Sequence, residues 1–232
     1  MKTLIFSDTH LTGRFERRRY RFLRRIISRA DKVIINGDFW DDCVDNHKFM
    51  RSGWRQLFPL LKSKDTIYIH GNHDMIGKWS EDPRIFCKKS CHEYRFRSGK
   101  KKFLVTHGHT LLHGSTSKEI ISKQKNLLAR SVWRFALFFP EHMRWFIVSL
   151  RLERLLVLLT RGRVYKRFRF LNERMRDNAG ELGKDEILIC GHSHVQEINL
   201  EKNYVNTGFV NHGIGQFIVI EKGDIRMMDE RD

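Results

Sequence analysis

Five short clusters of aspartate, asparagine and histidine punctuate the chain, and each directly follows a run of β-branched and aliphatic residues. They are Asp8-Thr9-His10, Gly37-Asp38, Gly71-Asn72-His73-Asp74, His107-Gly108-His109 and Gly191-His192-Ser193-His194. Because open α/β sheets bind ligands beyond the carboxyl ends of their strands, we expect these side chains to meet at one edge. Carboxylate, amide and imidazole donors suit Mn²⁺, Fe or Zn²⁺, and the lack of thiolates excludes a structural zinc finger.

The spacing within the clusters indicates how ions would be held. In Asp8-x-His10 and His192-x-His194 one residue separates two donors. If these segments are extended, both side chains of a pair lie on the same side and can bind one ion. Asp38 lies between the donor clusters in chain order, so we expect its carboxylate to bridge two ions. Two ions about 3.5–4 Å apart can convert a water into a hydroxide that attacks phosphorus in line.

The elements that must position these donors can be read from the hydrophobic pattern. Strands are predicted over 3–6, 33–35, 67–69, 93–97, 103–106, 187–190, 197–200, 204–206, 216–220 and 225–227. Helical periodicity covers 15–30 and 47–62, with apolar residues on one face of each segment. This order predicts an α/β fold with a mixed sheet, or two packed sheets, flanked by helices.

Residues 111–185 interrupt the alternation of strands and helices. The segment has almost no strand signal, and three helices are predicted over about 117–138, 141–160 and 164–178. We interpret it as a basic, aromatic-rich helical insertion, or lid, within a single domain of residues 1–232. Its apolar residues are either the wall of an acyl-chain pocket or the packed faces of an ordinary helical hairpin.

The net charge of +17 is concentrated in two segments. Residues 14–29 carry a net charge of +7, residues 111–176 carry +11, and the remainder carries −1. Such localisation indicates a surface for an anionic partner. We expect an anionic membrane surface, with nucleic acid as the less favoured partner. For residues 14–29, a solvated helix face remains the simpler alternative.

The composition also bears on location. The longest apolar runs, 145–150 and 155–159, are far shorter than a membrane-spanning helix requires. No cleavable signal opens the chain, and four scattered cysteines are typical of a reducing compartment. We therefore expect a cytoplasmic protein that associates peripherally with the inner face of the membrane.

The five clusters, in this order and after strands, resemble the signature motifs of the calcineurin-like metallophosphoesterase superfamily. The resemblance covers residues 1–110 and 186–228, and it implies a four-layer α/β/β/α sandwich with two divalent ions, Mn²⁺ before Fe or Zn²⁺. The implied ligands of one ion are Asp8, His10, Asp38 and His194, and those of the other are Asp38, Asn72, His107 and His192. His73 would donate a proton or bind phosphate and Asp74 would orient it, while Asp41 and His109 would support the ligands.

The layout is also similar to that of the UDP-2,3-diacylglucosamine hydrolases of lipid A synthesis, which cleave the pyrophosphate of a nucleotide-linked diacyl sugar at the membrane surface. His73 and His109 stand where that family typically has Arg and Asp. This narrower resemblance implies that the substrate is a nucleotide-linked lipid. The alternatives are a soluble nucleotide or nucleic-acid phosphodiesterase, and a non-catalytic membrane- or nucleic-acid-binding protein on the same scaffold.

Overall fold

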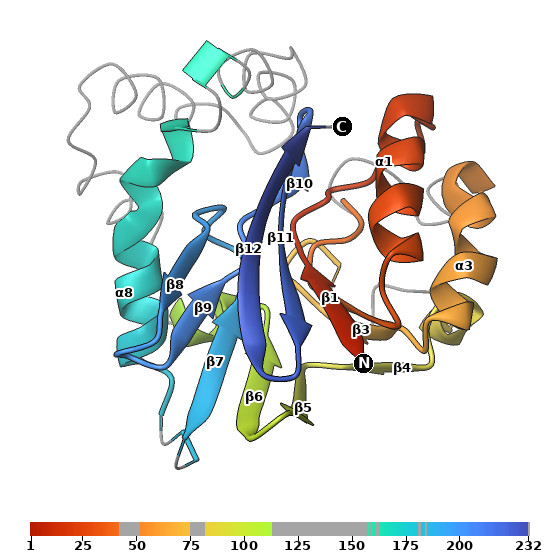
Figure 1. The fold of residues 1–232 in the computed structure, drawn as a ribbon. Coiled ribbons are helices and arrows are strands. Elements are labelled where there is room, and N and C mark those ends of the chain that lie inside the picture. Colours follow the sequence, from red (N-terminus) through yellow and green to blue (C-terminus); the bar gives the residue numbers. More distant parts are fainter. Residues whose placement is uncertain are drawn as a thin grey trace.

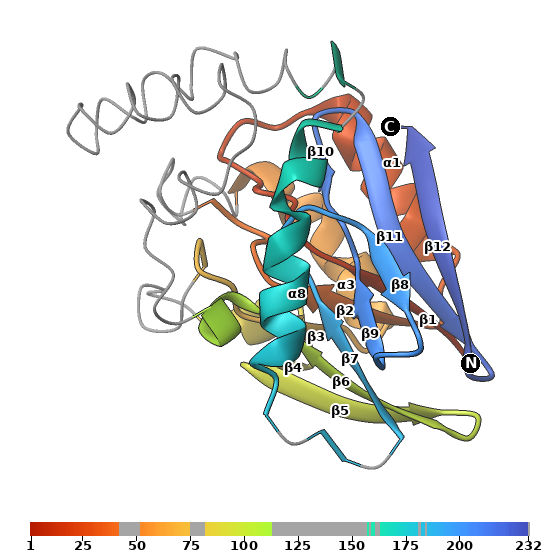
Figure 2. The same cartoon turned by 90° about the vertical axis from the view of Figure 1, so that its left-hand side faces the viewer.

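The computed structural model describes residues 1–41, 52–74, 82–112, 157, 159–160, 163–180, 182–183 and 185–231. Two β-sheets pack face to face, and helices cover the outer side of each sheet (Figure 1). Turned by 90°, the molecule presents the helix that covers the second sheet in front of the strands and the helices of the first sheet behind them (Figure 2). The mixed α/β fold confirms the expected four-layer sandwich.

The first sheet has seven strands. In spatial order they are β10 (Val210–Asn211), β11 (Ile214–Glu221), β1 (Lys2–Phe6), β2 (Lys32–Asn36), β3 (Ile67–Ile69) and β4 (Lys89–Cys91), and β12 (Asp224–Arg231) pairs with β11. β1 to β4 are parallel, whereas β11 is antiparallel to β1. β4 and β10 were not predicted, because neither contains a run of β-branched or aromatic residues: their sequences are Lys-Ser-Cys and Val-Asn.

The second sheet has five strands. Their spatial order is β5 (Glu93–Ser98), β6 (Lys101–Thr106), β7 (Glu186–Cys190), β9 (Tyr204–Asn206) and β8 (Glu197–Asn199). β6, β7 and β9 are parallel to one another. All ten predicted strands are therefore present in the two sheets.

Alternating side chains explain the layers. In β1, Leu4 and Phe6 belong to the core beneath the first helical layer, whereas Ile5 belongs to the core between the sheets. In β7, Ile189 faces the first sheet and Leu188 faces the other helical layer. Strands buried on both faces must be apolar almost throughout, which is the pattern of these segments.

The outer layer of the first sheet contains α1 (Arg17–Ser28), the 3₁₀ turn η1 (Arg55–Leu57) and α3 (Phe58–Ser63). α1 packs through Phe22, Leu23, Ile26 and Ile27, the face predicted for this helix. The helix predicted over 47–62 is interrupted, because a 3₁₀ turn precedes α3, which starts anew with a proline in its first turn. Residues 47–51 of that prediction lie outside the described residues.

The second sheet is covered by α8 (Arg169–Asp177), which follows the 3₁₀ segment η4 (Arg163–Phe168). Together they correspond to the third helix predicted in the insertion. Leu171 and Met175 of α8 pack on Leu104 and Leu188 of the sheet. The predicted helix 117–138 lies outside the described residues, as does 141–160 except for 157 and 159–160. Where the chain is described, no helix is both long and apolar enough to cross a membrane.

Candidate metal centre

The five predicted clusters meet at one edge of the sandwich. They occupy the loops after β1, β2, β3, β6 and β7, so the first three come from the first sheet and the last two from the second. A further 3₁₀ turn, η3 (His109–Leu112), begins inside the fourth cluster. The ring centroid of His109 is 5.5 Å from that of His107 and 6.3 Å from that of His192.

The backbone of these loops differs from the prediction. Five of the seven predicted ligands have left-handed φ values: Asp8 (54°), His10 (44°), Asp38 (49°), His192 (65°) and His194 (58°). The expected extended Asp8–His10 and His192–His194 segments are therefore wrong. Left-handed backbone is costly for non-glycine residues and persists only where surrounding contacts enforce it.

The side chains nevertheless converge into compact groups. Three sets have ligand atoms within 4.8 Å of one another: Asp8, His10 and His194; Asp38, His107 and His192; and His10, Asp38 and His73. The first two sets match most of the two implied ligand sets. Asp38 belongs to the second set and shares the third with His10, a member of the first, so its carboxylate lies between the two sets. Its Oδ2 is 3.9 Å from His10 Nε2.

Two close contacts join the sheets within these groups. His194 Nε2 lies 3.2 Å from Asp8 Oδ1, and His107 Nε2 lies 3.3 Å from Asp38 Oδ2. Both carboxylates are almost completely buried. Each pair joins a carboxylate of the first sheet to an imidazole of the second, so the centre forms at the junction of the sheets.

Unsatisfied buried atoms indicate that the site suits a cation. Asn72 Oδ1 is buried and, among the described residues, accepts no hydrogen bond. A buried acceptor without a partner costs about 1–3 kcal/mol. Gly71 allows the loop of Asn72 to approach, because a Cβ at this position would overlap the Asp38 carboxylate. An amide oxygen among carboxylates and imidazoles fits a divalent metal ion.

The titration behaviour of the site leads to the same conclusion. His107 Nδ1 donates to the Asn36 carbonyl at 2.8 Å, which leaves Nε2 facing Asp38. Burial lowers the pKa of His107, but the negative charges of Asp38 and Asp8 raise it to about 10. Without metal, the buried carboxylates therefore hold a proton on this imidazole. Divalent ions would supply that positive charge instead.

Two other ligands, Asp8 and His192, are in the forms that bind metal. Burial raises the pKa of Asp8, but the charge and hydrogen bond of His194 lower it to about 2. Burial and the charge of His107 lower the pKa of His192 to about 3. At neutral pH the first is a carboxylate and the second a neutral imidazole, as coordination requires.

His73 has a different partner from the one expected. Its Nδ1 lies 3.1 Å from Asp41 Oδ1, so Asp41, not Asp74, holds the ring. Burial lowers the pKa of His73, but the hydrogen bond with Asp41 and the charge of Asp38 raise it to about 9. The side chain is 31% exposed, more than those of the ligands His10 (13%) and His194 (20%). His73 is thus a protonated group at the open side of the centre.

Asp74 acts on the backbone instead. Its carboxylate accepts hydrogen bonds from four backbone N–H groups, those of Gly71, Asp38, Phe39 and Trp40. These bonds tie the loop after β3 to the loop after β2. The predicted role of Asp74 is corrected accordingly: it fixes the loop that carries His73, and among the described residues no hydrogen bond joins its carboxylate to the ring.

A buried polar network holds the loop of His192 and His194. Asn172 of α8 is completely buried, and its Oδ1 accepts from Ser193 Oγ at 2.6 Å and from Asn206 Nδ2 at 3.0 Å. Its Nδ2 donates to the Val195 carbonyl at 3.0 Å. The sequence analysis did not identify Asn172. The available signal was a polar residue on the same helix face as the apolar Leu171 and Met175, which is the face that α8 buries.

Aromatic residues surround His194. The His194 ring stacks on Phe209 with a centroid distance of 5.5 Å, and Tyr165 meets it edge-on at 4.7 Å. Tyr165 belongs to η4, inside the segment 111–185. The described end of the insertion therefore contacts a predicted ligand directly, which its sequence did not indicate.

Comparison with known proteins agrees with this geometry. The model of the calcineurin-like phosphoesterase family matches residues 1–196, a range that includes every predicted ligand. The chain therefore belongs to the calcineurin-like phosphoesterase family. Membership supports phosphoester hydrolysis and implies a dinuclear metal centre. No curated protein matches the chain significantly.

Several solved structures resemble the chain at low sequence identity. Yfce, a phosphoesterase from E. coli, is 12% identical over 100% of this chain and 99% of that one, with a TM-score of 0.47. A predicted phosphoesterase from Streptococcus pneumoniae is 13% identical over 99% and 88%, with a TM-score of 0.42. Zinc-complexed Vps29 from Entamoeba histolytica is 14% identical over 100% and 99%, with a TM-score of 0.45.

Proposed function

We propose that this protein hydrolyses a phosphodiester or pyrophosphate bond at a dinuclear metal centre between its two sheets. The observation that carries the proposal is the pair of donor groups, Asp8 with His10 and His194 and Asp38 with His107 and His192, and the closeness of Asp38 to His10 of the first group. Asp8, His10 and His194 would hold one ion, and Asn72, His107 and His192 the other, with Asp38 contacting both. We propose Mn²⁺ as the metal, with Fe and Zn²⁺ as alternatives, since all three accept this donor set.

Bound there, the ions would stabilise charge on the phosphoryl oxygens and lower the pKa of a coordinated water. His73 would act as the general acid that protonates the leaving group. Its raised pKa keeps it protonated at neutral pH, and Asp41 occupies Nδ1, so Nε2 is available to the substrate. A positioned imidazolium can donate a proton to the departing oxygen and offset developing negative charge.

We propose that the substrate is a nucleotide-linked diacyl sugar, cleaved at its pyrophosphate as UDP-2,3-diacylglucosamine hydrolases do, at the inner face of the membrane. The layout of the motifs supports this proposal, as does the basic and apolar composition of residues 111–185. The contact of Tyr165 with His194 brings the end of that segment to the centre. A soluble nucleotide or nucleic-acid diester is the alternative.

A parallel assay tests the proposal. Mn²⁺-loaded protein would be offered a UDP-linked diacyl sugar in micelles, a small chromogenic phosphodiester and single-stranded nucleic acid. We expect fastest turnover of the diacyl sugar. Replacing Trp133→Ala and Phe138→Ala together, in the part of the insertion outside the described residues, should slow only this substrate, because each unburied methylene costs about 0.8 kcal/mol.

Different outcomes reject different parts of the proposal. Absence of hydrolysis with every substrate would reject the phosphoesterase function itself. Faster cleavage of nucleic acid would reject the lipid substrate and leave the metal chemistry standing. An unchanged rate on the diacyl sugar in the Trp133→Ala, Phe138→Ala variant would reject an acyl-binding insertion.

A further inference from the structure

The exposed side of α1 carries a row of arginines that the metal centre does not use. Successive helical residues are about 100° apart, which places all these arginines within one arc of about 140°. They are Arg17, Arg18, Arg21, Arg24, Arg25 and Arg29, and all are exposed, as is Arg14 just before the helix. The opposite side of α1 is the buried apolar face. The only other side chain in the exposed arc is Ser28.

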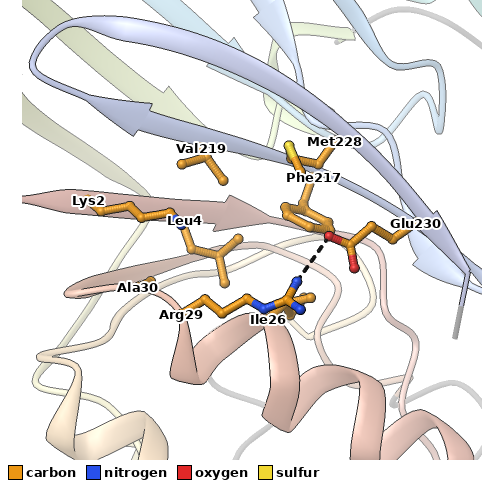
Figure 3. Close-up of a pocket in the computed structure, with 9 residues that line it drawn as sticks. All are labelled: Lys2, Leu4, Ile26, Arg29, Ala30, Phe217, Val219, Met228 and Glu230. Carbon is orange, nitrogen blue, oxygen red and sulfur yellow. Dashed lines mark hydrogen bonds and ion pairs between the residues drawn. The ribbon is translucent and has the colours of Figure 1, made fainter.

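These arginines are not equally neutralised. Arg25 and Arg29 at the end of α1 pair with Glu230 of β12, at 3.1 and 3.4 Å. Figure 3 shows Arg29 reaching Glu230 across a small pocket with an apolar lining. Within the described chain, by contrast, Arg17, Arg21 and Arg24 form no ion pair. The uncompensated charge is therefore concentrated over the first two turns of the helix.

We propose that this arginine face, defined as Arg14, Arg17, Arg18, Arg21 and Arg24, binds the phosphate backbone of nucleic acid. Residues 14–29 contain eight arginines and no lysine. One guanidinium group can donate two parallel hydrogen bonds to two oxygens of a phosphate, which a lysine ammonium cannot do. The face covers residues 17–24 of α1, about 12 Å along the helix axis. A row of charges of this length matches the repeating charge of a polynucleotide.

The composition of the exposed arc favours a polynucleotide over a membrane. Apart from its arginines, the arc contains only Ser28, so it offers a bilayer no apolar side chain for insertion. The apolar residues of α1 pack on the sheet instead. A polynucleotide held by its phosphates needs no such apolar contact.

The inference goes beyond the proposed function, because the arginine face lies outside the metal centre and would bind whichever phosphoester is cleaved there. The test is fluorescence anisotropy of Mn²⁺-loaded protein with a labelled 20-base-pair duplex over a range of salt concentrations, with duplex integrity checked on gels. Replacing Arg17→Gln, Arg21→Gln and Arg24→Gln together should weaken binding at least tenfold. It should also reduce the slope of log K against log salt by about 2.7, or 0.9 for each phosphate that an arginine no longer neutralises.

A matched control removes the same charge elsewhere. Arg97→Gln, Lys100→Gln and Lys202→Gln alter exposed residues on hairpins of the second sheet, and this variant should bind almost as the parent does. Hydrolysis of a small phosphodiester should be unchanged in both variants, which separates the inference from the proposed function. Three results would overturn it: a parent that does not bind the duplex, equal weakening in the two variants, or weakened binding only to anionic phosphatidylglycerol vesicles.

Discussion

The loops of the first sheet bring Asp8 and Asp38 to the metal centre, whereas those of the second sheet bring only imidazoles. The first sheet also contributes His73 and its partner Asp41. Negative charge therefore comes from the first sheet, whereas the second sheet supplies imidazoles. Of these, His192 is neutral and His107 holds a proton until a metal binds. Neither sheet alone offers a complete ligand set, so the centre depends on how the two sheets pack.

The loops of the two sheets are also held in place by different kinds of hydrogen bond. In the first sheet, Asp74 binds four backbone N–H groups, and Arg19 of α1 donates to the loop after β1. In the second sheet, the loop of His192 and His194 depends on side-chain hydrogen bonds to Asn172. Substitutions in the first sheet should therefore remove charge or chemistry, whereas those around Asn172 should displace ligands.

The largest effect is expected for Asp38→Asn. An amide cannot bridge two cations as a carboxylate does, so this variant should lose metal from the centre and reduce turnover by about 10³-fold or more. Elemental analysis and the rate on a small phosphodiester check both expectations. Two ions per chain together with the parental rate would contradict the bridging role of Asp38.

His73→Ala should separate chemistry from metal binding within the first sheet. Both ions should remain, while kcat falls by roughly 10²–10⁴-fold, the usual contribution of a positioned acid or base. Metal content and steady-state kinetics at saturating Mn²⁺ test this prediction. Loss of an ion along with the rate would make His73 a ligand, which its place in a group with His10 and Asp38 would then explain.

Asn172→Ala should weaken the second-sheet side without touching a ligand. Loss of partners that orient ligands typically lowers metal affinity by 10–100-fold. Isothermal titration with Mn²⁺ measures this effect. Leu171→Ala is the matched control, since it truncates a buried neighbour in α8 and costs about 2–5 kcal/mol of stability without altering the network. Equal metal affinity in the two variants would contradict a role of Asn172 in positioning His192 and His194 for metal binding.

The smallest effect concerns pH. Since the pKa of His107 is raised to about 10, its proton must leave when a metal binds. Asp8 and His192, with pKa values of about 2 and 3, do not titrate between pH 6 and 8. Lowering the pH should therefore weaken Mn²⁺ binding about tenfold per unit, with release of one proton. Calorimetric titrations in buffers of different ionisation enthalpy would measure the number of protons released. An Mn²⁺ affinity that does not change with pH would contradict the prediction.

Local patterns were sufficient to predict the strands and the edge at which the donors meet, whereas the four layers were implied by the family resemblance. The continuous apolar runs around Ile5 and Ile189 indicate strands buried on both faces, and the polar clusters mark the strand ends. The short strands β4 and β10 were missed because pairing with neighbours, rather than periodicity, makes them strands. The interruption of the helix predicted over 47–62 follows from η1 and from the proline in the first turn of α3.

The details of the centre depended on tertiary contacts that no local pattern reveals. Asp74 is adjacent to His73 in the sequence whereas Asp41 is 32 residues away, and only the folded loops decide which carboxylate meets the ring. The left-handed backbone of Asp8 and His192 likewise results from neighbouring loops. Asn172 joins the centre from a helix about twenty residues away from His192, so sequence proximity could not identify it.

Metal stoichiometry coupled to hydrolysis tests the central claim most directly. Metal-free protein would be titrated with Mn²⁺ while ions per chain and the rate on a small phosphodiester are recorded together. A dinuclear centre between the sheets predicts two ions per chain at saturation, with a rate that rises as the second ion binds and disappears when a chelator is added. Saturation at one ion or none, or hydrolysis that survives the chelator, would contradict it.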